Sequence, residues 1–293
     1  MSRIGIIGGS GLYQIEGLTN IKTIHVTTPF GDPSDAYIIG KLEGREVVFL
    51  PRHARGHRLL PSEIPYRANI FGMKKLGVTH IISVSAVGSL REDYKPTDVV
   101  LIDNFFDRTN QSRSHSFFGD GIVAHVQMAH PVCEPLRHIL IDAGKKSGAN
   151  IKESGIYLNI EGPQFSTLAE SYTYRKWGLD VIGMTQMSEA RLAREAEICY
   201  VTMAMVTDYD CWHEAETVET VSANGILKVM QKNTETAKEI IKQALPQVPE
   251  EDTCDCKNAL AVSFVTDKSL WPAETIEKLK PIIEKYLEHN DEI

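Results

Sequence analysis

The sequence lacks the features of a membrane, secreted or multidomain protein. No apolar run approaches the ~20 residues of a membrane-spanning helix, and the opening MSRIGIIGG enters an apolar segment without a signal-peptide pattern. There is no Ser/Gly-rich linker, no tandem repeat and no block of like charge. With 293 residues, 42% of them hydrophobic, the chain can bury a full core. We therefore expect one cytoplasmic domain spanning residues 1–293.

Positive charge is scarce. The chain has 31 Lys and Arg side chains against 39 Asp and Glu, a formal net charge of −8. At long range this charge repels polyanions, which disfavours nucleic acids and anionic membranes as partners. Any site for an anion must therefore be built from a local group of hydrogen-bond donors.

Cysteine is also sparse, with residues at positions 133, 199, 211, 254 and 256. None shows the C-x-x-C spacing typical of zinc sites, so we expect no metal. Cys254 and Cys256 form a C-x-C pair, which could form a strained disulfide or bridge to another cysteine. Reduced thiols in a short surface loop, VPEEDTCDCKN, are the favoured interpretation for a cytoplasmic protein.

Short apolar, β-branched runs alternate with segments of helical periodicity. Several runs are continuously apolar, which is typical of strands covered on both faces. The predicted strands cover residues 3–7, 36–40, 46–50, 80–86, 98–102, 155–160, 180–184 and 200–207. The predicted helices cover residues 66–76, 133–147, 167–177, 188–197, 224–244 and 272–290. This alternation predicts an α/β domain with a large central sheet, in which ligands collect where strands end.

Two predicted strand ends carry donors suited to an anion. The segment GIIGGSGL, residues 5–12, sets three glycines around Ser10 but has neither a dinucleotide fingerprint nor a P-loop. The segment PRHARGHRLLPSE, residues 51–63, holds three arginines whose planar forks match phosphate oxygens. His53 and His57 in it lack a third ligand in reach for a metal. A plain tight turn and a solvated charged loop are the alternatives.

Three further strand ends carry polar side chains. The segment SVSAVGSL, residues 83–90, ends in small residues and hydroxyls, and GMTQMSEARLARE leads into a helix that we expect to be capped near Ser188. Such groups suit phosphate or ribose oxygens. The segment EGPQFSTLAES offers Glu161 for sugar hydroxyls and the ring of Phe165 for stacking on a base. Each signal is weak alone, but several such loops meeting at one sheet edge would form a site.

The stretch MVTDYDCW places Asp208 and Asp210 directly after an apolar run. In an extended segment, residues two apart project to the same side. A calcium loop would need another oxygen ligand where Trp212 stands, and the two acids of a glycosidase must flank a bond from opposite sides. Acids on one side instead suit a ligand edge with several N–H donors, such as the exocyclic amine and a protonated N7 of adenine.

Together, the segments GGSGL, TPFGDPSDA, PRHARGH, GSLRE, EGPQFSTLAES, MTQMSEARLARE and TDYDCW resemble those of the 5'-methylthioadenosine phosphorylases, within the trimeric purine nucleoside phosphorylase family. The likeness runs from residue 4 to residue 243. It implies a phosphorylase/hydrolase-like single α/β domain, with helices flanking a mixed, partly barrel-like central sheet. It also implies a homotrimer, or a homohexamer built from two trimers as in some microbial members. Thermophilic members carry stabilising disulfides at a similar C-x-C pair, which leaves the state of Cys254 and Cys256 open.

The resemblance also implies which residues form the site. Phosphate would be held by Ser10, Arg52, His53, Ser85, Thr185 and the backbone of Ala86. The base would contact Phe165, Ile182 and Gly183, with Asp208 and Asp210 as the catalytic pair on its N7 and amino edge. The ribose would lie on Met184, and the 5'-methylthio group in an apolar slot formed by Val221, Ala223 and Ile226. His125 would be lent to the 5' pocket of a neighbouring subunit.

The implied reaction is phosphorolysis of S-methyl-5'-thioadenosine to adenine and 5-methylthioribose-1-phosphate. This is a pentosyl transfer of purine and methionine salvage, with phosphate as co-substrate and no metal or organic cofactor. Three alternatives stay open: a phosphorylase acting on adenosine or on 6-oxopurine nucleosides, a nucleosidase that uses water, and a non-catalytic nucleotide-binding protein. The acids of TDYD argue against a 6-oxopurine, because a carboxylate repels a carbonyl oxygen. A nucleosidase would not need Arg52.

Overall fold

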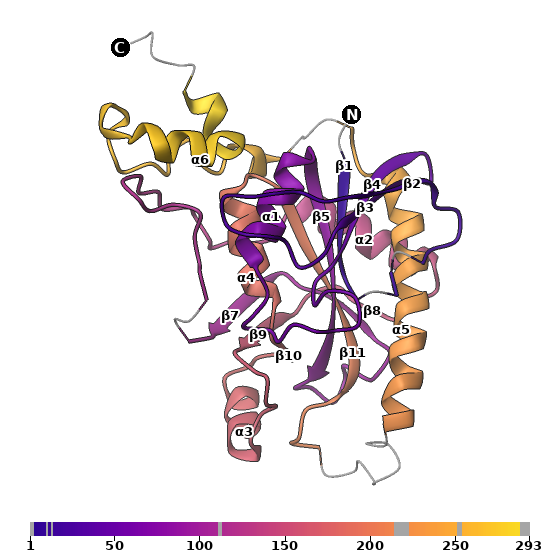
Figure 1. The fold of residues 1–293 in the computed structure, drawn as a ribbon. Coiled ribbons are helices and arrows are strands. Elements are labelled where there is room, and N and C mark those ends of the chain that lie inside the picture. The colour runs from indigo at the N-terminus through magenta and orange to yellow at the C-terminus, as the bar shows by residue number, and fades with distance from the viewer. Residues whose placement is uncertain are drawn as a thin grey trace.

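The computed structural model describes residues 3–9, 11–12, 14–110, 113–213, 223–250 and 254–287, with only the backbone for residues 223–227. One sheet of eleven strands runs through these residues, and helices pack against its faces (Figure 1). The strands are β1 Arg3–Gly8, β2 Thr19–Ile24, β3 Tyr37–Leu42, β4 Arg45–Pro51, β5 Val78–Ser89, β6 Val99–Leu101, β7 Asn104–Arg108, β8 Ile151–Lys152, β9 Ile156–Ile160, β10 Val181–Gly183 and β11 Cys199–Tyr209. The α-helices are α1 Tyr66–Lys75, α2 Glu134–Lys146, α3 Leu168–Lys176, α4 Gln186–Glu195, α5 Ala223–Ala244 and α6 Ala273–Ile283.

The sheet is mixed, and its centre is the long strand β5. Strand β5 pairs in parallel with β1 and β11, and β1 pairs in parallel with β4. The last residues of β5 pair antiparallel with β10, which continues the sheet through β9 to β7. Because β1, β4, β5 and β11 are parallel neighbours, their carboxyl ends lie at one edge of the sheet. The expected α/β class with a central mixed sheet is confirmed.

The central strands are apolar on both faces because each face meets a different core. On the first face, Ile6, Phe49 and Val201 belong to a cluster that includes residues of α2 and α5. Their chain neighbours Ile7 and Tyr200 belong to a second cluster, which includes residues of α1, α4 and α6. A fully buried side chain of this size contributes roughly 1.5–3 kcal/mol relative to an exposed one. The continuous apolar runs of the sequence are therefore the two-sided core strands.

All of the predicted strands and helices are present, with boundaries that shift by a few residues. The strands that prediction missed are β2, β7 and β8. The side chains of β2 and β7 are mostly exposed, and β8 has only two residues, so none carries an apolar run. The closing helix ends at Ile283 and continues as a short 3-10 turn, and the predicted residues 288–290 lie outside the described part of the chain.

The predicted cap of the fourth helix is wrong. Helix α4 begins at Gln186, with Thr185 in the N-cap position and without a side-chain bond to the helix end. Ser188 lies within the first turn, where its hydroxyl accepts a hydrogen bond from the side chain of Arg113. The hydroxyl that the sequence suggested as the helix cap therefore binds Arg113, which is distant in the sequence.

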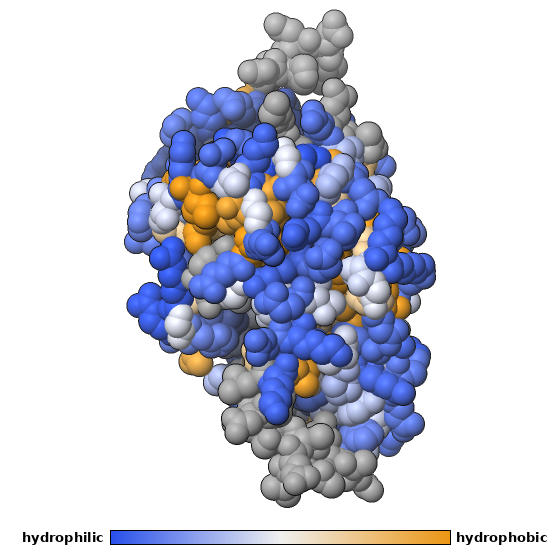
Figure 2. All heavy atoms as spheres, turned by 90° about the vertical axis from the view of Figure 1, so that its right-hand side faces the viewer, coloured by the Kyte–Doolittle hydropathy of each residue, from blue (hydrophilic) through white to orange (hydrophobic). Residues whose placement is uncertain are grey.

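Helix α5 is amphipathic and lies on one side of the molecule (Figure 1), with one of its faces buried. Its buried positions, Asn233, Ala237, Ile240, Ile241 and Ala244, recur every three or four residues. The face of the molecule that carries this helix is largely hydrophilic, with small apolar patches between polar side chains (Figure 2). Within the described ranges, no helix combines the length and the apolar character needed to cross a bilayer.

The packing of α1 on β3 leaves no space at Gly72. The hydroxyl of Tyr37 donates to the carbonyl oxygen of Asn69 at 2.8 Å, and a Cβ at position 72 would lie 2.1 Å from that hydroxyl oxygen. We expect Gly72→Ala to lower the free energy of unfolding by ~1–3 kcal/mol through overpacking, despite the helix preference of alanine. Urea denaturation measures the loss. In a Tyr37→Phe background, which lacks the hydroxyl, the same substitution should cost less; an equal cost would contradict the contact.

Candidate functional site

The pairing of β5 with its neighbours brings the predicted site residues together. Gly88 on β5 pairs with Asp208 on β11 and with Ile182 on β10, so the acids and the expected base-lining residues flank one strand. Earlier on β5, the carbonyl of Val84 accepts a hydrogen bond from Arg52 at 3.0 Å. The strand rises about 3.3 Å per residue, so the two groups are separated by roughly 10–13 Å along β5. The site therefore has two polar ends on one strand.

Arg52 is buried and forms an ion pair with Glu189. Its Nε and Nη2 both donate to the Glu189 carboxylate, the second at 3.2 Å, and Nη2 also donates to Ser83 at 2.6 Å. With the Nη1 bond to Val84, four of the five guanidinium N–H groups have protein acceptors. The fork that the sequence suggested for an anion faces Glu189 instead, and one Nη1 N–H has no acceptor among the described residues.

The ion pair keeps Arg52 charged. Burial alone would lower the pKa of Arg52, but the charge and hydrogen bonds of Glu189 outweigh burial and raise the pKa. Breaking one partner of such a pair leaves an uncompensated buried charge, which is far more costly than the pair itself. Arg52 and Glu189 therefore act as one structural unit.

A chain of buried polar groups links this unit to Thr185. The Tyr200 hydroxyl lies 3.0 Å from Glu189 Oε2 and 2.8 Å from Gln186 Oε1. The amide nitrogen of Gln186 donates to Thr185 Oγ1 at 3.0 Å. All of these side chains are buried, so each hydrogen bond fixes the next in position. The network thereby fixes the position of Thr185 relative to Arg52, and both residues are expected to bind the anion.

His53 is half-buried and neutral. Its Nδ1 lies 2.8 Å from the carbonyl oxygen of Leu59, which can only accept, so Nδ1 carries the proton and Nε2 is an acceptor. Burial, with a smaller contribution from the charge of Arg52, lowers the pKa of His53 to about 4. The ring of His57 stacks on His53 with 4.2 Å between centroids. Stacked rings do not converge on a common ion, which fits the absence of a third ligand near them in the sequence.

The other two arginines of the segment point outward. Arg55 is exposed and its Nε lies 3.6 Å from a carboxylate oxygen of Asp35. Arg58 is exposed and its Nε donates to the carbonyl oxygen of Arg55 at 3.1 Å. Of the three arginines in PRHARGHR, Arg52 alone is buried against the strand ends.

The two acids at the end of β11 differ in their surroundings. The register against β5 shifts between Val206 and Asp208, so Thr207 is an extra residue whose hydroxyl bonds to Asp208. Asp210 is 8% exposed, and its backbone N–H donates to the carbonyl of Ser89 at 2.9 Å. Its Oδ2 finds no donor among the described residues. A buried carboxylate oxygen without a donor is costly, so this atom is a candidate acceptor for a ligand N–H.

An apolar wall stands beside the acids. Ile182 is buried in a cluster with Leu158 and Trp212, and the indole N–H of Trp212 donates to the carbonyl of Ser89 at 2.8 Å. At Gly183 a Cβ would lie 2.0 Å from the hydroxyl of Tyr157, so only glycine fits there. Phe165, between β9 and α3, is 83% exposed, so its ring is accessible to a ligand.

Arg113 is a buried residue of the site that the sequence did not reveal. Its Nη1 donates to the carbonyl of Met184 at 2.7 Å, and its Nε and Nη2 donate to the carboxylate and carbonyl of Glu161 at 2.9 and 2.7 Å. The second carboxylate oxygen of Glu161 accepts from the backbone N–H of Asn110 at 3.0 Å. Glu161, expected to meet sugar hydroxyls, thus holds Arg113. Arg113 lies in a polar segment, NQSRSHS, that shows no periodicity, so no pattern marked it.

Ser85 and Ala86 lie on β5, and Met184 directly follows β10. The Ser85 hydroxyl is 3.4 Å from that of Tyr157, and Ala86 is exposed. Met184 is half-buried, and its sulfur would lie 2.5 Å from a Cβ at Gly162. The side chain of Met184 thus packs against Gly162, and its carbonyl accepts from Arg113.

Four predicted positions lie where the structure describes no side chain. Ser10 and Val221 lie outside the described residues, and Ala223 and Ile226 lie on α5 where only the backbone is described. His125 is exposed and lines a surface cavity of about 590 Å³ that Met187 and Arg191 of α4 also line. The backbone N–H of His125 donates to the carbonyl of Ser263 at 2.8 Å. The loop that carries His125 is thus joined to the C-terminal part of the chain.

Comparisons with a family model, with curated sequences and with solved structures all indicate the same family. A family model described as "Phosphorylase superfamily" matches residues 3–246. The chain is similar to S-methyl-5'-thioadenosine phosphorylases of Koribacter versatilis (54% identity, 97% of each chain) and Geobacter sulfurreducens (54%, 97% of this chain and 99% of the relative). It is also similar to the crystal structure of a methylthioadenosine phosphorylase from an antarctic soil metagenomic library, with a TM-score of 0.90, 48% identity and coverage of 96% of this chain and 98% of the other. The Schistosoma mansoni methylthioadenosine phosphorylase with adenine gives a TM-score of 0.82 at 36% identity, covering 89% and 96%.

The ion pair at the centre of the site can be tested by stability measurements. We expect Glu189→Ala to lower the free energy of unfolding by ~3–5 kcal/mol, because it leaves the Arg52 charge buried without its partner. The double variant Arg52→Met with Glu189→Met removes both charges and should recover most of that loss in urea denaturation. Equal losses for the single and the double variant would show that the side-chain volume, and not the charge, accounts for the effect.

Proposed function

This chain belongs to the phosphorylase superfamily, and we propose that its strand-end site catalyses phosphorolysis of S-methyl-5'-thioadenosine to adenine and 5-methylthioribose-1-phosphate. The reaction is a pentosyl transfer of purine and methionine salvage. The observation that carries the assignment is the buried Oδ2 of Asp210, which has no donor among the described residues. Asp210 lies two residues from Asp208, and the Asp208 and Arg52 groups both contact β5. One end of the site thus has a carboxylate oxygen for a ligand N–H, and the other offers donors to an anion.

The acid pair recognises the amino edge of adenine in this proposal. Asp210 Oδ2 accepts a hydrogen bond from the exocyclic amine, and Asp208 shares a proton with N7 as the C1'–N9 bond stretches. Adenine is a poor leaving group as an anion, and general-acid assistance of this kind contributes about 100 to 10,000-fold in rate. Ile182 and Gly183 line one side of the base, and Phe165 stacks on it. The carbonyl oxygen of a 6-oxopurine would instead face a carboxylate that repels it.

Phosphate occupies the other end of the site. Ser10, Ser85 and Thr185 donate from their hydroxyls, Ala86 from its backbone N–H, and Arg52 from its remaining Nη1 N–H. His53 Nε2 is an acceptor in the neutral ring, so it pairs with a protonated oxygen of the phosphate. Because Glu189 offsets the charge of Arg52, Arg52 does not neutralise the negative charge of the phosphate, and that charge acts on the sugar. It stabilises the oxocarbenium-like transition state before phosphate attacks C1'.

The remaining contacts involve the sugar and the assembly. Met184 lies under the ribose, and Val221, Ala223 and Ile226 form the apolar slot for the methylthio group. His125 serves the 5' pocket of a neighbouring subunit, which makes a homotrimer, or a hexamer of two trimers, the working form. The whole chain, residues 1–293, acts as one cytoplasmic domain, with phosphate as co-substrate and no metal or organic cofactor in the reaction.

One assay tests the proposed reaction: adenine or hypoxanthine release from methylthioadenosine, adenosine and inosine, each with and without phosphate. Adenine release from methylthioadenosine should require phosphate and give 5-methylthioribose-1-phosphate. Adenosine should react less well, because each buried CH₂ contributes about 0.8 kcal/mol, roughly a fourfold effect. Inosine should be inert. Release at the same rate without phosphate would identify a nucleosidase, and good turnover of inosine would contradict the role of the acid pair.

The proton role of Asp208 has its own test. Asp208→Ala should raise the barrier by ~2–4 kcal/mol, which is a loss of about 30 to 1,000-fold in kcat, while the KM for phosphate changes little. Asp208→Asn is the matched control for shape, since it keeps the size of the side chain but cannot share a proton in the same way. Near-normal kcat in Asp208→Ala would assign the proton transfer to another group.

A further inference from the structure

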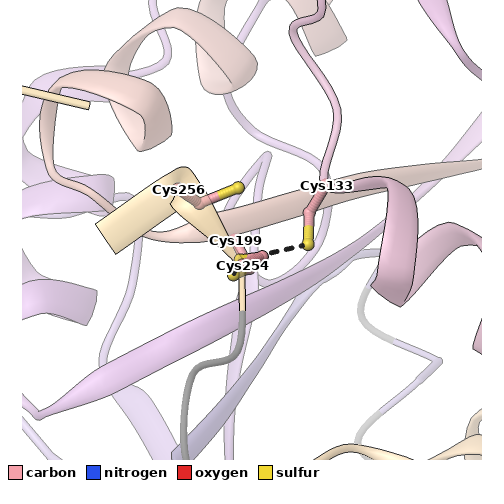
Figure 3. Close-up of side chains that lie close together, drawn as sticks. All are labelled: Cys133, Cys199, Cys254 and Cys256. Carbon is pink, nitrogen blue, oxygen red and sulfur yellow. Dashed lines mark hydrogen bonds between the residues drawn. The ribbon is translucent and has the colours of Figure 1, made fainter. Parts of the chain in front are cut away.

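Four of the five cysteines converge on one point. Cys133 precedes α2, Cys199 begins β11, and Cys254 and Cys256 lie at and within the short 3-10 helix η2, Asp255–Asn258. Their sulfur atoms all lie within 4.8 Å of one another (Figure 3). Cys133, Cys199 and Cys256 are buried, and Cys254 is half-buried. Cys133 and Cys254, which are 121 residues apart in the chain, thus lie side by side.

The four sulfurs lie close to the spacing of a tetrahedral thiolate site, with one pair closer together than such a site requires. A Zn–S bond of about 2.3 Å places the sulfurs of a tetrahedral site roughly 3.8 Å apart. The Sγ atoms of Cys133 and Cys254 are 3.8 Å apart, and those of Cys199 and Cys254 are 3.0 Å apart. All four are free thiols, with no disulfide between any two of them. One ion at the centre of the group would reach every sulfur with small side-chain movements.

A positively charged side chain lies beside the group. The Nη1 of Arg194 lies 3.8 Å from the sulfur of Cys256. A divalent cation with four thiolates carries a net charge of −2, and a nearby guanidinium reduces the cost of burying that charge.

We propose that Cys133, Cys199, Cys254 and Cys256 bind one Zn²⁺ ion in a structural site. Four thiols lose up to four protons and form four Zn–S bonds, with no change in oxidation state. Four protein ligands leave no open coordination position, which is the arrangement of a structural site and not of a catalytic one. The expectation of no metal relied on C-x-x-C spacing, and this site combines one C-x-C pair with two distant cysteines, a pattern that the spacing rule does not cover.

The position of the site indicates its role. Cys199 and Asp208 lie near opposite ends of β11, nine residues and so roughly 30 Å apart, which separates the ion from the reaction. The C-x-C pair instead leads into residues 263–265. There the carbonyl of Ser263 accepts from the N–H of His125 at 2.8 Å, and the N–H of Val265 donates to Val123 at 2.9 Å. The ion therefore fastens the C-terminal segment, and through it the loop of His125, to the central sheet.

The test measures metal content of the full chain purified with a reductant and without chelators. We expect about one zinc per subunit by mass spectrometry of the metal. Cys254→Ser should reduce that content at least tenfold. Cys211→Ser is the matched control, because Cys211 is the exposed fifth cysteine outside the group, and its metal content should equal that of the unchanged protein. Zinc below a tenth per subunit, both as purified and after incubation of the reduced protein with Zn²⁺, would overturn the proposal.

Two further measurements use the unchanged protein, so they do not depend on the folding of a variant. Titration with a mercurial thiol reagent should modify five thiols per subunit, the exposed Cys211 and the four of the group, and should release the zinc as those four react. Reaction of all five thiols without zinc release would overturn the proposal. The mass of the denatured, non-reduced protein should be that of free thiols. A metal-free protein whose mass is lower by four hydrogen atoms would contain two disulfides instead, which also overturns it.

Discussion

The parallel pairing of β5 with β1 and β11 is the constraint on which the site depends. Strand β5 is twelve residues long. It pairs with β11 along most of its length, with β1 over its first part and with β10 at its last residues. A slip of one residue in this register would turn every side chain to the opposite face. The two-sided apolar core prevents such a slip, because each face of β5 fits different helices. Core packing thereby determines which polar groups meet at the strand ends.

Most polar groups in the buried interior of the site are hydrogen-bonded to one another. Arg52, Glu189, Tyr200, Gln186 and Thr185 form a continuous buried chain, and a buried network is stable only when its groups are paired. Asp210 Oδ2, in contrast, is a buried oxygen of the site without a donor among the described residues. The contrast separates the two kinds of polar group: paired groups hold the scaffold, and the unpaired oxygen is available to a ligand.

Sequence periodicity predicted the core strands and helices because their apolar residues repeat with the period of the element. The sequence also pointed to the two acids, because a spacing of two in an extended segment predicts Asp208 and Asp210 on one side; in the structure Asp208 lies on β11 and Asp210 directly after it. The partners of Arg52 and Arg113 were not, because Glu189 lies 137 residues from Arg52 and Glu161 lies 48 from Arg113. The same holds for the cysteine group, and β2 and β7 were missed because exposed strands carry no apolar run. Local patterns reveal elements, whereas contacts between distant segments appear only in the folded chain.

The β-bridge between Ala124 and Phe264 joins the His125 loop to the last part of the chain. In the proposed assembly, His125 serves the subunit next door, so sequence drift in the C-terminal segment would alter a neighbour's choice of 5' group before its own. Substrate preference would then be inherited across an interface. In mixed oligomers of two variants, the preference of each pocket for a 5' group would depend on the C-terminal segment of the adjacent protomer.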